Sequence, residues 1–198
     1  MAINLTKGGE RHIINLQKHS DSITIHANLN WTQVKLKGFF SNLLSKQEVD
    51  LDLGCMFELI DGSKGVIQPL GNSFGSKSNS PYILLDKDDR SGNASDGENM
   101  FVYKPALVKR VVFFALIYQG APDFNSVNAK MFFKISNGET ITLDLDNAGS
   151  SKPLCAAALF TNNSGQYSIQ KEARYFPSHQ ETDKHYGFGF NWVQGSKD

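Results

Sequence analysis

Residues 49–60 read VDLDLGCMFELI, and this stretch decides the fold class of the chain. Apolar side chains occupy every second position, and polar or larger ones fall between them. The apolar set is Val49, Leu51, Leu53, Cys55, Phe57 and Leu59, and the other set includes Asp50, Asp52, Met56 and Glu58. Successive side chains of a β-strand leave opposite faces, so this alternation predicts a strand. Asp61-Gly62 then predicts a turn into a second strand at Val66-Ile67.

Further segments with the features of β-strands lie on both sides of this stretch. Residues 23–31 alternate in the same way, and 110–118 (RVVFFALIY) form a short apolar run that is typical of a central strand covered on both faces. Asn137-Gly138 is a strong hairpin signal between 130–136 and 139–145. Residues 154–161 and 166–176 are predicted to form another antiparallel pair.

Turn signals recur at regular spacing, without an internal repeat or a linker-like segment. We therefore predict one all-β domain over residues 1–198, an antiparallel β-sandwich, with a closed barrel as the alternative. Helical structure is expected only as short turns after Pro122 and near 180–185, while 34–46 fit either a loop or a short helix.

Composition limits the possible functions. The chain has 198 residues with 20 Lys+Arg and 20 Asp+Glu, so its formal net charge is zero and broad electrostatic binding to nucleic acid is not expected. Cys55 and Cys155 both lie in apolar runs and are expected to be buried. The N-terminal stretch MAINLTKGGE lacks an apolar segment, and no run of about 18 apolar residues follows, so we expect a cytoplasmic protein.

Residues 86–99 (DKDDRSGNASDGEN) concentrate acidic side chains in one predicted loop. They are Asp86, Asp88, Asp89, Asp96 and Glu98. Calcium takes 6–8 oxygen ligands from carboxylates, amides and carbonyls, all of which this loop offers. A solvated acidic loop is the alternative.

Asp50 and Asp52 add a second observation, because they leave the same face of one strand roughly 6.6 Å apart. Two carboxylates this close repel unless a positive charge lies between them. A metal ion shared with the acidic loop supplies that charge, and partner lysines or arginines are the alternative. Neither the acidic loop nor the stretch from Asp144 matches the spacing of an EF-hand.

Two other patterns carry weaker signals. Gly71-Asn72-Ser73-Phe74-Gly75 matches the G-x-S-x-G nucleophile elbow, but the residues after it read as loop rather than helix, which favours a glycine-rich turn over a catalytic Ser73. His179, Asp183 and His185 have loose spacing for a zinc site and are interpreted as surface residues.

Several segments resemble the TerD-domain family of tellurite-resistance and stress-response proteins. These are 49–57 (VDLDLGCMF), 88–99 (DDRSGNASDGEN) and 5–9 (LTKGG). Residues 61–75, 119–122 (QGAP) and 174–192 resemble its TerA-type branch. The resemblance implies a calcium-binding β-sandwich, similar in topology to C2 domains, without known catalytic activity. It also implies a cytoplasmic protein that acts with other tellurite-resistance proteins, some of them membrane-associated.

The resemblance also implies a set of metal ligands. Asp50 and Asp52 match the D-x-D strand of the family, and Asp88, Asp89, Ser91 and Gly92 match the first half of its metal loop. The second half departs from the family pattern, so either Asp96 or Glu98 fills the next ligand position. Thr32 follows Trp31 where many members carry Asp, which favours one bound calcium ion or two bound less tightly.

We therefore expect a calcium-binding, non-enzymatic stress-response protein, a sensor or scaffold that binds protein partners and neither nucleic acid nor a small-molecule substrate. A calcium-dependent membrane-docking module and a serine hydrolase using Ser73 are the alternatives. Direct detoxification of tellurite is disfavoured, because it calls for exposed soft ligands or redox thiols.

Overall fold

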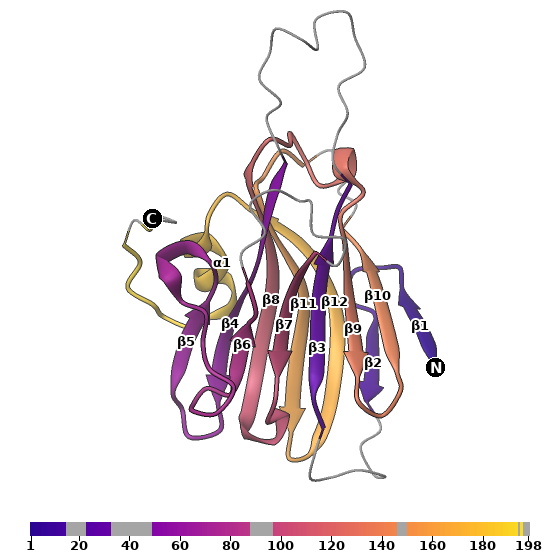
Figure 1. Cartoon of the computed structure of the whole chain (residues 1–198), viewed down its shortest axis with the longest axis vertical. Helices are drawn as coiled ribbons and strands as arrows, with labels where there is room; N and C mark the ends of the chain where they lie inside the picture. Colours follow the sequence, from indigo (N-terminus) through magenta and orange to yellow (C-terminus); the bar gives the residue numbers. More distant parts are fainter. Residues whose placement is uncertain (15–22, 33–48, 88–96, 146–149, 194, 196–198) are drawn as a thin grey trace, which may run out of the picture.

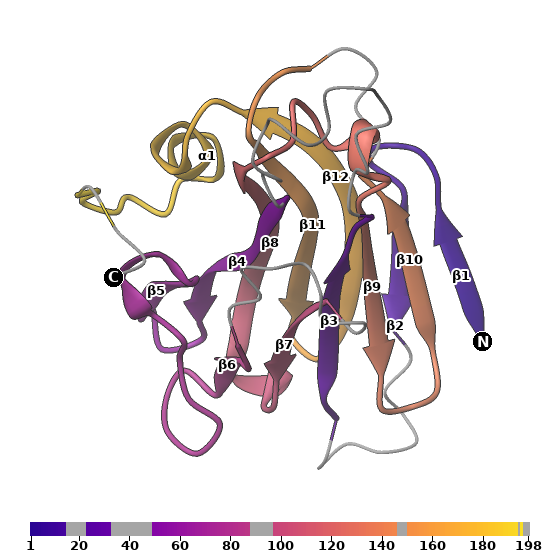
Figure 2. The ribbon, with the colours of Figure 1, turned by 45° about the horizontal axis from the view of Figure 1, so that its top comes forward.

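The computed structural model describes residues 1–14, 23–32, 49–87, 97–145, 150–193 and 195. Within them, two six-stranded sheets pack face to face, so the predicted β-sandwich is confirmed (Figures 1 and 2). The first sheet has the order β1 (Ala2–Leu5), β10 (Thr140–Asp144), β9 (Lys130–Ile135), β3 (Ile25–Asn30), β7 (Glu98–Val102) and β6 (Ile83–Leu85). The second sheet has the order β2 (Arg11–Ile14), β12 (Gln166–Phe176), β11 (Leu154–Asn163), β8 (Val108–Gln119), β4 (Asp50–Leu59) and β5 (Lys64–Ile67).

Neighbouring strands run antiparallel except at one edge, where β1 pairs with β10 in parallel. The hairpins predicted at Asp61-Gly62 and Asn137-Gly138 join β4 to β5 and β9 to β10. The helical segments of the described residues are three short 3-10 turns and one α-helix. They are η1 (Leu70–Asn72), η2 (Pro105–Leu107), η3 (Asn125–Val127) and α1 (His179–Tyr186). The turns predicted after Pro122 and near 180–185 correspond to η3 and α1.

The main core lies between the two sheets. Alternate residues of β4, such as Leu51, Leu53 and Cys55, meet Phe113 of β8 and Phe133 of β9 there, and the two phenylalanine rings meet edge to face with centroids 5.0 Å apart. Each of these side chains is fully buried. The predicted in-facing set of β4 is therefore confirmed.

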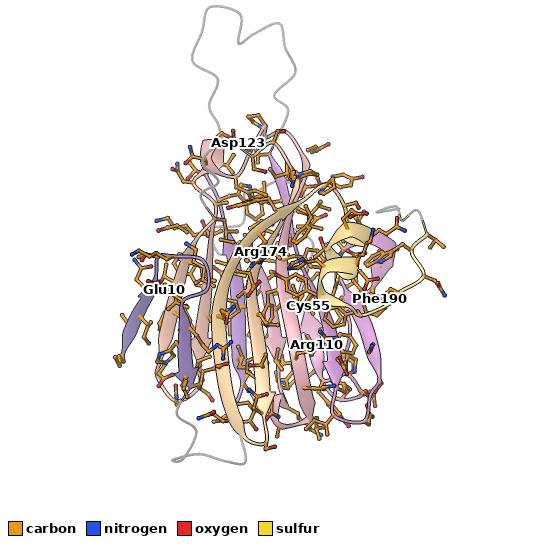
Figure 3. All side chains as sticks on the ribbon, turned by 180° about the vertical axis from the view of Figure 1, so that it is seen from behind. Glu10, Cys55, Arg110, Asp123, Arg174 and Phe190 are labelled. Atoms are coloured by element: carbon orange, nitrogen blue, oxygen red, sulfur yellow. The ribbon has the colours of Figure 1, made fainter. Side chains whose placement is uncertain are left out.

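The other face of β4 is covered as well. Every residue of β4 is buried. Met56 belongs to a second apolar cluster on the outer face of the second sheet, together with Val112, Phe114 and Phe188. The cover comes from α1 and the chain that follows it, which lie over this face in Figure 3.

Candidate metal site at one end of the sandwich

Asp50 and Asp52 lie at the beginning of β4, and both are 1% exposed. Asp50 pairs with Gln119 and Asp52 with Leu116, near the end of β8. A register shift separates Asp50 from Leu51, so the strand is irregular between the two carboxylates. Leu51 and Leu53 flank Asp52 and face the main core, which directs the Asp52 side chain to the opposite face of the strand.

Glu98 lies beside the same part of β4, although it comes from the other sheet. It is the first residue of β7, and its side chain is fully buried. Its Oε2 accepts the backbone N–H of Leu53 at 2.6 Å. β5 pairs only with Cys55 to Glu58 of β4, so the carboxylate of Glu98 takes an N–H at a point that β5 does not reach. Glu98 thus bridges the two sheets within one residue of Asp52.

The sequence placed Glu98 in the acidic loop, whereas the structure places it in a strand. The backbone turn into that strand is made by Gly97, which has a φ of +62°. A Cβ atom on Gly97 would come within 2.1 Å of the Leu29 carbonyl oxygen. The close approach of Gly97 to β3 therefore fixes where β7 begins and where the Glu98 side chain enters the sandwich.

Trp31 and Thr32 lie at the same end of the sandwich. The indole Nε1–H of Trp31 donates to the carbonyl of Val49 at 3.2 Å, directly before Asp50. The N–H of Thr32 donates to the carbonyl of Val127 in η3 at 2.7 Å. Many members of the family carry Asp after this tryptophan. In this chain that position is Thr32, next to the residue that contacts Val49.

Five of the predicted ligands fall outside the described residues. They are Asp88, Asp89, Ser91, Gly92 and Asp96. The chain before and after them is described: Asp86 is exposed, and its N–H donates to the carbonyl of Asn99 at 2.9 Å. Across the parts of the chain that the structure describes, no group of three or more His, Cys, Asp or Glu side chains is arranged to hold a metal ion. The ligand set stays a prediction that depends on residues 88–96.

The weaker patterns from the sequence have structural explanations in the described residues. Ser73 follows η1, and its hydroxyl donates to the Val66 carbonyl at 2.7 Å within a turn. Gly75 then bridges to Leu84 rather than starting a helix. Neither Cys55 nor Cys155 forms a disulfide, and both are fully buried, as predicted; burial raises the pKa of the Cys55 thiol.

His179, Asp183 and His185, all among the described residues, do not form a metal-binding group. His185 is exposed, as predicted. The carboxylate of Asp183 instead accepts the backbone N–H groups of Gly189 and Phe190 at 2.7 and 2.8 Å. His179 packs between aromatic rings, so its interpretation as a surface residue is wrong. Sequence reasoning missed the aromatic residues that follow α1, namely Phe188, Phe190 and Trp192, because they belong to no strand and pack on a distant sheet.

The fold and this site define a β-sandwich protein that buries acidic side chains at one end of the sandwich. A scan of protein-family models finds none that matches the chain. The tellurium resistance protein TerA of an Alcaligenes species is 34% identical to this chain. The alignment is 204 positions long and covers 98% of this chain. This similarity supports a TerA-type tellurite-resistance family for the chain, as its sequence motifs indicated.

The chain spans 58% of the length of that relative. None of the helices in the described parts of the chain is long and apolar enough to cross a membrane.

Proposed function

We propose that this protein binds calcium at the end of the sandwich where Asp50, Asp52 and Glu98 lie, and acts as a non-enzymatic, calcium-dependent sensor or scaffold in tellurium resistance. One observation carries the proposal: Asp50 and Asp52, each 1% exposed, lie at the start of β4, and the buried Glu98 of the other sheet accepts the N–H of the adjoining Leu53. Burying ionised carboxylates is costly unless positive charge or hydrogen bonds compensate. In this proposal a divalent cation, held also by residues of the acidic loop, contributes to that compensation.

The donor chemistry favours a hard cation. Carboxylate oxygens suit calcium, magnesium or manganese, whereas zinc and copper favour histidine and cysteine ligands. Cys55, the nearest cysteine along β4, faces the main core. In this proposal Asp50, Asp52 and Glu98 hold one side of the ion. The remaining oxygens come from Asp88, Asp89, Ser91, Gly92 and Asp96, and calcium is preferred because it accepts the larger number of ligands.

The link to tellurium resistance rests on the family and on the name of the relative. Because the chain spans 58% of that relative, the role of the longer protein is transferred here only as part of the proposal. We propose a cytoplasmic location and protein partners from the same resistance system, including membrane-associated ones. The formal net charge of zero argues against nucleic acid as a partner.

Isothermal titration calorimetry with calcium tests the site directly. Asp52→Asn and Asp88→Asn each remove one charged ligand while keeping the size of the side chain, so we expect the affinity for calcium to fall at least tenfold in both variants. Asp61→Asn is the matched control, since Asp61 is an exposed aspartate in the turn that ends the same strand. Calcium binding that is unchanged in Asp52→Asn and Asp88→Asn would contradict the assignment of the site.

A further inference from the structure

The C-terminal chain forms a separate layer on the outer face of the second sheet. We call residues 179–193 the strap: it consists of α1, the left-handed turn at Gly187 and the irregular chain that follows. Residues 187–193 join no strand of either sheet. Figure 3 shows the helix and Phe190 at one side of the sandwich, next to the strands that carry Arg110 and Cys55.

Side chains of the sheet hold the strap at a few points. Arg110 of β8 donates from Nη1 to the Tyr186 carbonyl at 2.7 Å, and its guanidinium lies 4.2 Å from the centre of the Phe188 ring. Lys64 of β5 donates from Nζ to the Phe188 carbonyl at 3.0 Å. Glu58 of β4 accepts from Arg110 at 2.7 Å and so orients the guanidinium.

Within the strap, Asp183 ties the irregular chain to the helix. Besides the N–H groups of Gly189 and Phe190, its carboxylate accepts the indole N–H of Trp192 at 2.9 Å. Asp183 is 4% exposed, so these bonds are shielded from water. Residues 183–192 are therefore connected among themselves and are able to move as one unit.

Beneath the strap lies an apolar patch that does not belong to the main core. The patch consists of Met56, Val112, Phe114, Leu154 and Ala156, all fully buried, and Phe188 of the strap packs on it. The strands under it are already paired on both sides: β8 with β4 and β11, and β11 with β12. Removing the strap thus leaves every described β-ladder intact and uncovers apolar surface, which is typical of a contact site for another protein.

His179 lies at the contact between strap and sheet. Its ring centroid is 5.2 Å from that of Phe114 on the sheet and 5.3 Å from that of Trp192 in the strap. Its Nε2 has no hydrogen-bond partner among the described residues. This position accepts a neutral imidazole, and burial accordingly lowers the pKa of His179 to about 4.

We propose that the strap is an acid-sensitive cover: protonation of His179 releases it from the second sheet and exposes the apolar patch. An imidazolium in this position has no carboxylate among its ring contacts, which are Phe114 and Trp192. The sheet also presents the cations of Lys64 and Arg110 to the strap, and these oppose a further positive charge.

Three carboxyl groups also lie in or next to the strap, and each has its own hydrogen-bond partners. Glu58 faces it from β4, where Lys109 and Arg110 lower the pKa of its carboxyl and keep it ionised in mild acid. Glu172 of β12 accepts the hydroxyl of Tyr186 at 2.7 Å. Asp183 lies within the strap and binds its irregular chain, so the experiment has to separate Asp183 from His179.

The sign of the pH effect follows from the depressed pKa. A released His179 has the ordinary value of 6.5, and a docked one has a value of about 4. Docking is therefore fully favoured above pH 6.5 and weakens as the pH falls. Each pH unit between the two values reduces the docking equilibrium about tenfold, which gives a total of roughly two to three orders of magnitude at pH 4.

Fluorescence of Trp192 follows this release. The chain has two tryptophans, so Trp31→Phe leaves Trp192 as the only emitter. In chelator, we expect its emission to shift to the red between pH 6.5 and 4 and an apolar dye to bind, while the circular dichroism of the sheets stays constant. The same dye titration on the unchanged chain guards against an effect of Trp31→Phe itself.

Two variants assign the titrating group. His179→Phe keeps an aromatic ring that does not ionise, and we expect the midpoint of release to move at least one pH unit lower. Asp183→Asn removes the competing carboxylate, and we expect release to keep its dependence on pH. Three results would each overturn the proposal. The pH midpoint of release could stay unchanged in His179→Phe, or release could lose its dependence on pH in Asp183→Asn. In the unchanged chain, the circular dichroism of the sheets could be lost together with the onset of dye binding.

Discussion

At the scale of single residues, Glu98 makes the contact that connects the two sheets beside the candidate metal site. Its carboxylate satisfies the N–H of Leu53, which is itself fully buried. This buried hydrogen bond joins the two sheets, so Glu98 has a structural function in the fold besides its proposed function as a metal ligand. The stability of the metal-free protein is expected to report on it.

Glu98→Ala leaves the buried N–H of Leu53 without its acceptor. We expect the free energy of unfolding to fall by about 1–3 kcal/mol, which is the usual penalty for a buried donor without a partner. Urea denaturation in chelator measures this change. Glu98→Gln is the matched control, because its amide oxygen still accepts the N–H, and it should lose less. An Ala variant as stable as the unchanged protein would show that the contact contributes nothing.

At the scale of elements, the boundary between the acidic loop and β7 positions the site. Gly97 is required there for two reasons: its φ of +62° and the 2.1 Å that would separate a Cβ atom from the Leu29 carbonyl oxygen. The added Cβ atom would meet the backbone of Leu29, and backbone cannot rotate away as a flexible side chain does. A change at Gly97 is thus expected to move the start of β7 and Glu98 with it.

Gly97→Ala should destabilise the protein by at least about 2 kcal/mol, because the left-handed backbone costs roughly 1–2 kcal/mol and the contact with β3 adds to it. Gly62→Ala is the control: Gly62 also has a positive φ of +86°, but nothing lies within 4 Å of its added Cβ atom. Denaturation of the two variants gives the difference. Equal losses would mean that the close approach to Leu29 has no energetic consequence.

The elements also show what sequence alone was able to predict. Alternation identified β3 and β4, and turn residues identified the β4–β5 and β9–β10 hairpins, because both signals are local. β7 was not predicted as a strand, because its first residue, Glu98, continues a run of acidic and glycine residues that reads as loop. β6 has only three residues, too few for a periodic pattern.

The same contrast holds for the candidate site. Asp50 and Asp52 were predicted from their spacing on one strand, which depends on neighbouring residues only. The choice between Asp96 and Glu98 stayed open, since the contact of Glu98 with Leu53 spans 45 positions in the sequence. The part of the strap after α1 escaped prediction for a similar reason. Phe188, Phe190 and Trp192 recur at every second position but belong to no strand, and their packing depends on a sheet whose strands lie far away in the sequence.

At the scale of the whole molecule, β4 carries residues of both proposed regions. Asp50 and Asp52 lie at its beginning. Further along the strand, Met56 belongs to the apolar cluster under the strap, and Glu58 accepts from Arg110, which holds the strap. The proposed binding of calcium and the proposed release of the strap are therefore separate events on one sheet. The calcium proposal and the strap proposal stand or fall on different measurements.

Calcium is the central claim, and thermal unfolding in chelator, in calcium and in magnesium tests it most directly. At about 100 times its dissociation constant, a ligand adds ~2.7 kcal/mol to the folded state. For a chain of this size that is a rise in Tm of roughly 5–11 °C. We predict this rise with calcium, a clearly smaller one with magnesium, and none with calcium in Asp52→Asn. A Tm that is the same in chelator and in calcium would contradict the account.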